Sequence, residues 1–568
     1  MSLLDKASLV QIPSGYKEDK LYSVVPDSGA GDFTFSRSST GTRVNADGYI
    51  EDAPWNLLNY SEDLTGANGW RQDLGLTTQL TTEINPIGVN SCYKTIADTN
   101  TNTHYTYSTN AIGNLSYFGG FCVSFYAKPN GYNWIRYYNN NNAFGVDINI
   151  VTGEIQNKRE DSIGTILVED APNGWKKVSL QFDRLISYSY AMLKPMPTAL
   201  GNSTFAGDGV SGMFLWGIQI SKGLNFKPYI KRTDGFDVPR LDYSGGASCP
   251  TLLLEPQSTN LVTQSETFSN WGTEGGKQVV TQGVLISPDG TLNGNKLETY
   301  NSTNSNPRKL WIAKTVTVGA SYTFSVYIKQ VSGQINSGFL HITTGANDTF
   351  DVSQAYTATD QWQRVSVTTN SAVSSQIRFL ITGDANSQIY IWGGQVEQQS
   401  YPTSYIPTSG TSITRVEDLC VATSMTDLIG QTEGVVNLKF QKEYTDTYRI
   451  FSLFGTSTSN RIGLYTLNDT LRVFSISGGV SQFDTTVLSS IGNGTFNIAL
   501  QYKLDDYKVY VNGNEVYTNT TAAIPASLED ILFAQTPTGG SPFYHKIDYL
   551  RLFKETLTDT ELAALTTI

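Results

Sequence analysis

The sequence predicts an all-β protein that is built from tandem β-sandwich or jelly-roll modules. Short segments rich in aromatic and β-branched residues recur along the chain, as at 121–128, 322–329 and 507–511, with turn-forming Gly, Asn, Asp and Ser between them. The 568 residues include 51 Gly, and long stretches of helical periodicity are nearly absent. Sheets of many short strands must bury one face against a second sheet, as sandwiches and jelly rolls do.

The chain begins with a segment, residues 1–55, that we expect to form a region of its own. It contains two expected strands, at 33–37 and 42–45. The Asp47-Gly48 pair that follows them is a strong hairpin-turn signal. This segment is therefore expected to consist of short strands joined by tight turns.

An internal repeat organises the middle of the chain. Its two copies open with the same pattern, NLLNYSE at 56–62 and NLVTQSE at 260–266. Further matches follow in the same order, and they pair 124–128 with 325–329, 175–179 with 362–366, 216–220 with 392–396, and 229–230 with 405–406. The copies predict one β module at 56–235 and a second at 260–410, with a connector at 236–259 between them.

A sandwich of a different kind is expected at 431–568, after a linker at 411–430. Its expected strands are 435–440, 450–454, 471–476, 496–502 and 507–511. The linker contains Thr-Arg-Val at 414–416, which repeats the Thr-Arg-Val of the first segment. We therefore expect Arg43 and Arg415 at joints between modules.

The clearest helix signal lies at the end of the chain. Thr558 and Glu561 have the spacing of a capping box, and Leu557 and Leu562 occupy the positions of a hydrophobic staple. The remaining sequence is long enough for only about two turns of helix.

Composition and charge exclude several classes of protein. The net charge of -12 and the absence of Lys or Arg runs argue against a nucleic-acid partner. No run of 18 apolar residues is present, and the first twenty residues lack the apolar stretch of a signal peptide, so neither membrane insertion nor export is expected. The four cysteines are scattered without a CxxC pair, which favours a reducing site of synthesis.

The sequence gives no positive signal for an enzyme, and we predict no catalytic residue. The three histidines, His104, His341 and His545, lie in different modules without partners at metal-ligand spacing. Two carboxylates of a glycosidase could still be present among 51 acidic residues, so that alternative stays open. No cofactor is predicted.

A calcium site has one candidate. Asp505 and Asp506 lie between two expected strands of the last domain, and carboxylate oxygens are the ligands that Ca²⁺ prefers. The alternative is an ordinary hairpin turn, in which Asp is common.

Glycan binding is the positive functional hypothesis, because sugars stack on aromatic rings and hydrogen-bond to carboxylates and amides. Six of the nine Trp fall into repeat pairs and are expected in the cores; they are Trp70, Trp175, Trp216, Trp271, Trp362 and Trp392. Unpaired Trp134 begins a polar, aromatic stretch that we interpret as a glycan-binding loop, a wet subunit interface or an ordinary surface loop. The glycan-binding candidates are Trp134, Arg136, Tyr137, Tyr138, Asn139 and Trp311.

Two resemblances extend these inferences. The KVYVNGNEVY hairpin and the ending IDYLRLF before LTDTEL resemble a concanavalin A-like or laminin G-like domain at 431–568. The SRSSTGTRVN segment, the LDYSGG and LLLEPQ connector and YIPTSG at 405–410 resemble virion proteins of tailed bacteriophages, of the crAss-like kind. In such proteins the repeated module is similar to carbohydrate-binding-module jelly rolls.

The phage resemblance implies a fibre or appendage protein on the head or tail. It also implies a homotrimer, assembly in the host cytoplasm, location in the virion, and attachment to capsid, head-fibre base or tail proteins through residues 1–55. We expect binding of host-surface or mucosal glycans. The alternatives are a decoration or spacer protein without glycan binding, and a polysaccharide-degrading tail spike, against which the absence of β-helix repeats argues.

Overall fold

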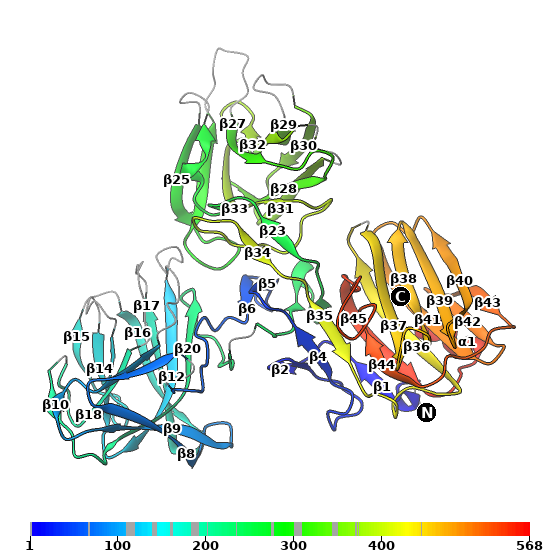
Figure 1. Cartoon of the computed structure of the whole chain (residues 1–568). Coiled ribbons are helices and arrows are strands. Elements are labelled where there is room, and N and C mark those ends of the chain that lie inside the picture. Colours follow the sequence, from blue (N-terminus) through cyan, green and yellow to red (C-terminus); the bar gives the residue numbers. More distant parts are fainter. Residues whose placement is uncertain are drawn as a thin grey trace. The chain divides into compact units, whose positions relative to one another are not determined.

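The structure is a computed structural model, and strands dominate every part of it (Figure 1). It describes residues 3–65, 69–108, 120–138, 145–159, 163–182, 192–201, 203–233, 236–273, 278–299, 309–343, 350–369, 372, 374–444 and 446–568. Within these residues one α-helix forms, α1 (Asp559–Thr566), and no helix is long and apolar enough to cross a membrane. The all-β prediction is confirmed.

The chain divides into two compact units. The smaller unit contains Pro54–Phe236 and Gln282–Gly294. The larger unit contains Met1–Ala53, Asp237–Thr281 and Asn295–Ile568. Sequence neighbours are thus separated between units, while segments that lie hundreds of residues apart share one unit.

The first repeat copy forms two antiparallel six-stranded sheets in the smaller unit. One sheet has the order β16 (Ile163–Ala171), β17 (Trp175–Phe182), β12 (Phe121–Asn130), β20 (Gly212–Lys222), β9 (Asn90–Ala97), β8 (Leu76–Ile84). The other has the order β15 (Ile155–Arg159), β14 (Gly145–Asn149), β13 (Trp134–Tyr138), β18 (Met192–Met196), β11 (Tyr105–Ser108), β7 (Trp70–Asp73). Apolar side chains such as Phe125, Ile135 and Val178 fill the core between them.

The second copy repeats this design with five strands in each sheet. One sheet has the order β25 (Gln278–Leu285), β26 (Gly294–Thr299), β33 (Gln388–Glu397), β28 (Tyr322–Gln330), β31 (Gln363–Thr369). The other has the order β24 (Gly272–Thr273), β27 (Lys309–Thr315), β32 (Gln376–Gly383), β29 (Ser337–Thr343), β30 (Val352–Thr357). Five of the six repeat-paired Trp are buried, and Trp362 is half-buried. The prediction that these residues belong to cores is confirmed for the five.

The C-terminal sandwich is larger. One sheet has the order β21 (Leu241–Asp242), β22 (Thr251–Leu253), β45 (Lys546–Phe553), β36 (Glu433–Lys442), β41 (Gly494–Lys503), β42 (Tyr507–Val511), β43 (Asn514–Asn519), and β1 (Leu9–Gln11) also pairs with β45. The other has the order β2 (Tyr16–Lys17), β3 (Lys20–Leu21), β4 (Phe33–Ser36), β35 (Leu419–Ala422), β44 (Leu528–Leu532), β37 (Asp446–Gly455), β38 (Arg461–Asn468), β39 (Thr470–Ser477), β40 (Val480–Ser489). The predicted capping box of α1 is present, with Thr558 and Glu561 bonded to each other's backbone.

Short pairs and turns complete the element list. These are the ladders β5 (Gly41–Val44) with β6 (Ile50–Ala53), β10 (Thr101–Asn102) with β19 (Phe205–Ala206) and β23 (Ser258–Asn260) with β34 (Ile413–Arg415), and the 3₁₀ turns Leu3–Lys6, Pro172–Gly174, Ser244–Gly246 and Phe268–Asn270. The β23–β34 ladder joins the chain where it enters the second copy to the chain where it leaves.

The N-terminal segment does not form a region of its own. Its strand β1 pairs with β45, and β4 pairs with β35. Leu9, Phe33 and Phe35 are fully buried in the core of the C-terminal sandwich. Local strand signals were correct here, but they carried no information about a pairing partner more than 500 residues away. The segment thus completes the last domain instead of standing apart from it.

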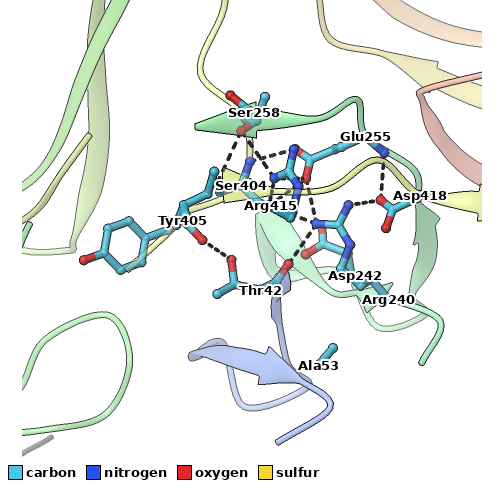
Figure 2. Close-up of polar contacts among 12 residues, drawn as sticks. Thr42, Ala53, Arg240, Asp242, Glu255, Ser258, Ser404, Tyr405, Arg415 and Asp418 are labelled. Carbon is cyan, nitrogen blue, oxygen red and sulfur yellow. Dashed lines mark hydrogen bonds and ion pairs between the residues drawn. The ribbon is translucent and has the colours of Figure 1, made fainter. Parts of the chain in front are cut away.

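A buried charge cluster ties these distant segments together (Figure 2). We call Arg37, Arg240, Glu255, Arg415 and Asp418 the ion-pair node. Their side chains are at most 8% exposed. The Arg37 guanidinium lies 2.9 Å from the Asp418 carboxylate, while Arg240 contacts both Asp418 and Glu255, the latter at 2.6 Å. Arg415 lies 2.8 Å from Glu255.

The node holds three cationic and two anionic side chains, and backbone carbonyls satisfy further donors. Arg37 donates to the carbonyl of Ala53, Arg240 to that of Thr42, and Arg415 to that of Pro256. Burial alone would raise the pKa of the Glu255 carboxyl, but Arg415 and Arg240 outweigh it and hold that pKa well below its usual value. The node is therefore charged at neutral pH.

The node includes one of the two arginines that the sequence placed at joints. Arg415 is a member, as its position in the linker predicted. Arg43 is not a member, because it pairs with Glu51 across its own β5–β6 hairpin at 3.0 Å. A shared Thr-Arg-Val pattern therefore did not imply a shared environment.

The burial of Phe33 gives a test of the N-terminal contribution. Phe33→Ala leaves a cavity in the C-terminal sandwich, and we expect it to lower the free energy of unfolding by about 3–5 kcal/mol. Val24→Ala is the control, because Val24 lies in the same segment but is 47% exposed. Urea denaturation followed by circular dichroism measures both. An unchanged C-terminal transition in Phe33→Ala would contradict the fold.

The node makes a second prediction. Asp418→Asn leaves the buried Arg37 and Arg240 without a full counter-charge, which should destabilise the larger unit by about 3–5 kcal/mol. Asp170→Asn should change stability little, because Asp170 pairs with Lys176 while 91% exposed. Calorimetric melting compares the two variants, and equal melting profiles would refute the role given to the node.

Candidate functional site

In the second copy, one sheet face brings together the residue types that bind sugars. Residues directly opposite in an antiparallel ladder share a face. The register aligns one row across all five strands, consisting of Gly272, Trp311, Leu380, His341 and Ser353. Neighbours of alternate parity, such as Leu310 and Phe379, point into the core. We call the side bearing this row the outer face of the β24-β27-β32-β29-β30 sheet.

Aromatic rings gather on this outer face. Phe339 stacks beside His341 with ring centroids 5.5 Å apart, and Phe350 stacks on His341 at 3.7 Å. Phe339 is 42% exposed. Across the sheet the indole of Trp311 lies close to Gly272, where an added Cβ would come within 2.3 Å of the ring. Any other residue at position 272 would clash with the indole, so the close packing of Trp311 against the backbone requires this glycine.

Polar and cationic groups accompany the rings. The guanidinium carbon of Arg378 lies 4.6 Å from the centroid of the Trp311 ring. Lys309 and Thr382 are opposite each other, and Thr382 is in turn opposite Phe339. Lys309 and Thr382 are buried, whereas Arg378 and Trp311 are half-buried and Phe339 is exposed. The accessible part of the face therefore combines aromatic rings with the donors of Arg378.

His341 is held between two hydroxyls. Its Nδ1 lies 2.7 Å from the Ser353 Oγ, and its Nε2 lies 3.0 Å from the Thr382 Oγ1. Burial, with a smaller contribution from Lys309, lowers the pKa of His341 to about 4. In a Ser-His-Asp triad one ring nitrogen of the histidine contacts the serine and the other contacts a carboxylate. Here the two ring nitrogens of His341 contact the hydroxyls of Ser353 and Thr382, so neither of these two contacts is with a carboxylate.

The corresponding face of the first copy carries the other predicted residues. The expected loop at Trp134 is wrong, because Trp134–Tyr138 forms strand β13 with every residue buried. Ile135 and Tyr137 pack into the core, while Arg136 stands opposite Asp147 on the other side of the sheet. Asn139 lies outside the described residues. The strand reads Trp-Ile-Arg-Tyr-Tyr and is buried on both faces, so no apolar–polar alternation marks it, and the Asn-rich run that follows it has the composition of a loop.

This face of the first copy is covered. Trp134 packs in a small cluster with Tyr132, Met196 and Phe205. Arg136 pairs with Asp147 at 2.6 Å, and the Asp147 carboxylate also accepts the backbone N–H of Gly201 at 2.7 Å. Residues 199–201 and Phe205 therefore lie over β13. Glycan contact through Trp134, Arg136, Tyr137 and Tyr138 stays a prediction that their burial does not favour.

One further polar group holds this cover in place. Lys194 donates to the carbonyls of Gly201 and Ser203, at 3.2 and 2.6 Å. Burial lowers the pKa of Lys194 to about 8, although Asp147 opposes the shift. The two copies thus share a scaffold but differ in access to the same sheet face.

The calcium candidate lies in a turn. Asp505 has a positive φ of 56°, and its backbone N–H and that of Asp506 donate to the carbonyls of Ala522 and Lys503. Across the described part of the chain, no group of three or more His, Cys, Asp or Glu could hold a metal ion. Both aspartates thus lie in a turn, and calcium binding there stays a prediction.

The C-terminal domain has a recognisable family. Residues 438–563 match the family model described as the concanavalin A-like lectin/glucanases superfamily. The predicted fold of this domain is thereby confirmed. No curated protein matches the chain.

Several solved structures resemble parts of the chain. The CBM40 of the Ruminococcus gnavus IT-sialidase, bound to α2,3-sialyllactose, is 17% identical over 24% of this chain and 84% of its own, with a TM-score of 0.22. The tandem CBM22 domain of Paenibacillus barcinonensis Xyn10C is 14% identical over 61% and 98%, with a TM-score of 0.23. Domain 4 of AbnA, a GH43 arabinanase of Geobacillus stearothermophilus, is 17% identical over 30% and 84%, with a TM-score of 0.23.

The environment of His341 makes a prediction about pH. Between pH 6.5 and 4 the unfolded chain binds a proton at residue 341 that the folded module does not, so acidification through this window should lower the free energy of unfolding. In the folded protein, NMR should show the imidazole titrating near pH 4. In the variant His341→Gln the free energy of unfolding should fall less between pH 6.5 and pH 4 than in the unchanged protein. Titration near pH 6.5 would contradict the buried position.

Proposed function

We propose that the protein is a non-catalytic glycan-binding protein and that it binds sugars on the outer face of the second copy. The observation that carries the proposal is the row across that sheet, where Trp311 and His341 share a face with the partly exposed Phe339. A pyranose presents apolar C–H groups on its faces and hydroxyls at its edge. Aromatic rings suit the former, and polar side chains suit the latter.

The polar groups are arranged to serve the ring edge. Arg378 lies beside Trp311 and is half-buried, so it is a cationic group of this face that a ligand can reach. Lys309, in the row that contains Phe339, is buried and takes no part. Ser353 is exposed and hydrogen-bonds to His341, so its hydroxyl is held in one position on the face. In the proposal these side chains bind the sugar and orient it on the face. A glycosidase would need two carboxylates beside the sugar, and the rows of this face named above contain none.

The proposed setting is a phage virion, where the chain would be a head or tail fibre or appendage that binds host-surface or mucosal glycans. The support is the sequence resemblance alone. The same resemblance supports a homotrimer attached to other virion proteins, and assembly in the host cytoplasm. In the alternative, a decoration or spacer protein, Phe339 and its neighbours would be buried between subunits instead of binding sugar.

A glycan array tests the proposal. We expect saturable binding by the whole chain, and a loss of about tenfold in Trp311→Ala and Phe339→Ala, since one stacked ring contributes roughly 1.4 kcal/mol. Tyr22→Ala is the control, because Tyr22 is a similarly exposed aromatic of the N-terminal segment.

Light scattering on the same samples separates the alternatives. A correctly folded trimer that binds no glycan would favour the spacer role. Binding that survives both substitutions would place the site elsewhere and overturn the proposal for this face.

A further inference from the structure

A cavity of about 150 Å³ lies in the larger unit, at a place distinct from the outer face. It is open on one side. Its floor is apolar and aromatic, formed by Val44, Ile50, Tyr327 and Tyr405, which pack with the buried Trp392. The floor therefore contains residues from both the β5–β6 hairpin and the second copy.

The rim of the cavity is polar. Lys546 donates to the Ser244 Oγ and to the Glu443 carboxylate, each at 2.7 Å, and lies 3.6 Å from Asp242. Arg364 donates to the Ser325 hydroxyl at 2.9 Å. Among the described residues, the buried Nε of Arg364 has no hydrogen-bond partner. The charged groups of the rim are therefore held in place by other protein groups.

The back wall is rigid. Glu255 lines the cavity and belongs to the ion-pair node. The backbone N–H and the hydroxyl of Ser404 both donate to the Glu255 carboxylate, at 2.7 and 2.6 Å. A wall that is already ordered costs little further entropy when a ligand binds.

We propose that this cavity binds a single neutral six-membered sugar ring. A cavity of about 150 Å³ holds a ring of the size of benzene, whereas sites for larger ligands occupy roughly 300–1,000 Å³. A hexopyranose has twice as many heavy atoms as benzene, so its ring would enter the cavity and part of its substituents would lie in the opening to solvent. An apolar floor with a polar rim matches a hexopyranose, with its C–H face toward Val44 and Ile50. Its hydroxyls would meet the Tyr327 hydroxyl, Lys546 and Glu443, because the Arg364 guanidinium lies over the Tyr327 ring, 5.4 Å from its centroid.

Charge balance selects the neutral sugar. Three basic and three acidic side chains line the cavity; they are Arg43, Arg364, Lys546, Asp242, Glu255 and Glu443. Most are already paired, as in the Lys546–Glu443 and Arg43–Glu51 contacts. An added ammonium group would therefore lose hydration without gaining an unpaired carboxylate. An added carboxylate would meet Arg364, whose guanidinium already donates to the Ser325 hydroxyl and the Thr403 carbonyl.

The first copy supplies a matched control. Tyr126 stands opposite Lys177 in β17, as Tyr327 stands opposite Arg364 in β31. Each tyrosine meets a Trp at a similar distance, 5.3 Å in the first copy and 5.5 Å in the second. The tyrosine of the first copy does not line the cavity, so Tyr126→Phe controls for Tyr327→Phe.

The test is a titration of the whole protein, followed by saturation-transfer NMR, with the methyl glycosides of glucose, galactose, mannose and N-acetylglucosamine. N-acetylneuraminic acid and glucosamine are the charged probes. We expect at least one neutral glycoside to bind with a millimolar dissociation constant. Tyr327→Phe and the exposed rim variant Glu443→Gln should each weaken it about fivefold, the value of one hydrogen bond. Tyr126→Phe should leave it unchanged.

Three outcomes would overturn the inference: no binding of any neutral glycoside, tighter binding of a charged probe, or an equal loss in Tyr126→Phe. Trp311→Ala separates this cavity from the outer face. Monosaccharide binding that survives Trp311→Ala belongs to the cavity, even if the array shows no binding to the face. Loss of binding in Trp311→Ala alone would assign the signal to the face and contradict the cavity site.

Discussion

The buried ion-pair node is the constraint on which the larger unit depends. The chain leaves the C-terminal sandwich twice, after residue 53 and near residue 260, and returns twice to complete it. Asp418 receives Arg37 from the N-terminal segment and Arg240 from the connector, and Glu255 receives Arg415 from the returning linker. Charges buried this completely are stable only as a full set, so the N-terminal segment, the connector and the linker must all three be present together. The repeated modules are then best regarded as insertions into one composite domain.

Duplication gave the protein two copies of one scaffold, and the copies differ in what lies over the same sheet face. In the first, Lys194 and Asp147 anchor the segment that covers Trp134. In the second, Phe339 keeps 42% of its surface exposed beside the His341 stack. The sheet face that is covered by the first copy's own residues is thus available to a ligand or to another subunit in the second copy.

The cavity beside the node is a separate consequence of the composite domain, because its walls come from segments that the node brings together.

Local patterns in the sequence predicted what depends on local chemistry. The all-β class, the Thr558 capping box and the burial of the repeat-paired Trp175, Trp216 and Trp392 all follow from neighbouring residues or from the repeat. Pairing between β1 and β45 could not be predicted this way, since strand signals do not name a partner. The sequence selected Trp311 but not Phe339, His341 or Gly272, because only the register aligns them. Trp134 was misjudged because the run of Asn at 139–142 that follows its strand has the composition of a loop.

The central claim is that segments far apart in the sequence form one cooperative body around the node. Hydrogen exchange measured by mass spectrometry on the whole chain tests it most directly, since elements of one cooperative unit open together. The account predicts that Leu9–Gln11, Phe33–Ser36 and Thr251–Leu253 are protected to the same extent as Glu433–Lys442 in the centre of the C-terminal sheet. Exchange of the N-terminal and connector strands that is orders of magnitude faster than exchange of the central strand would contradict it.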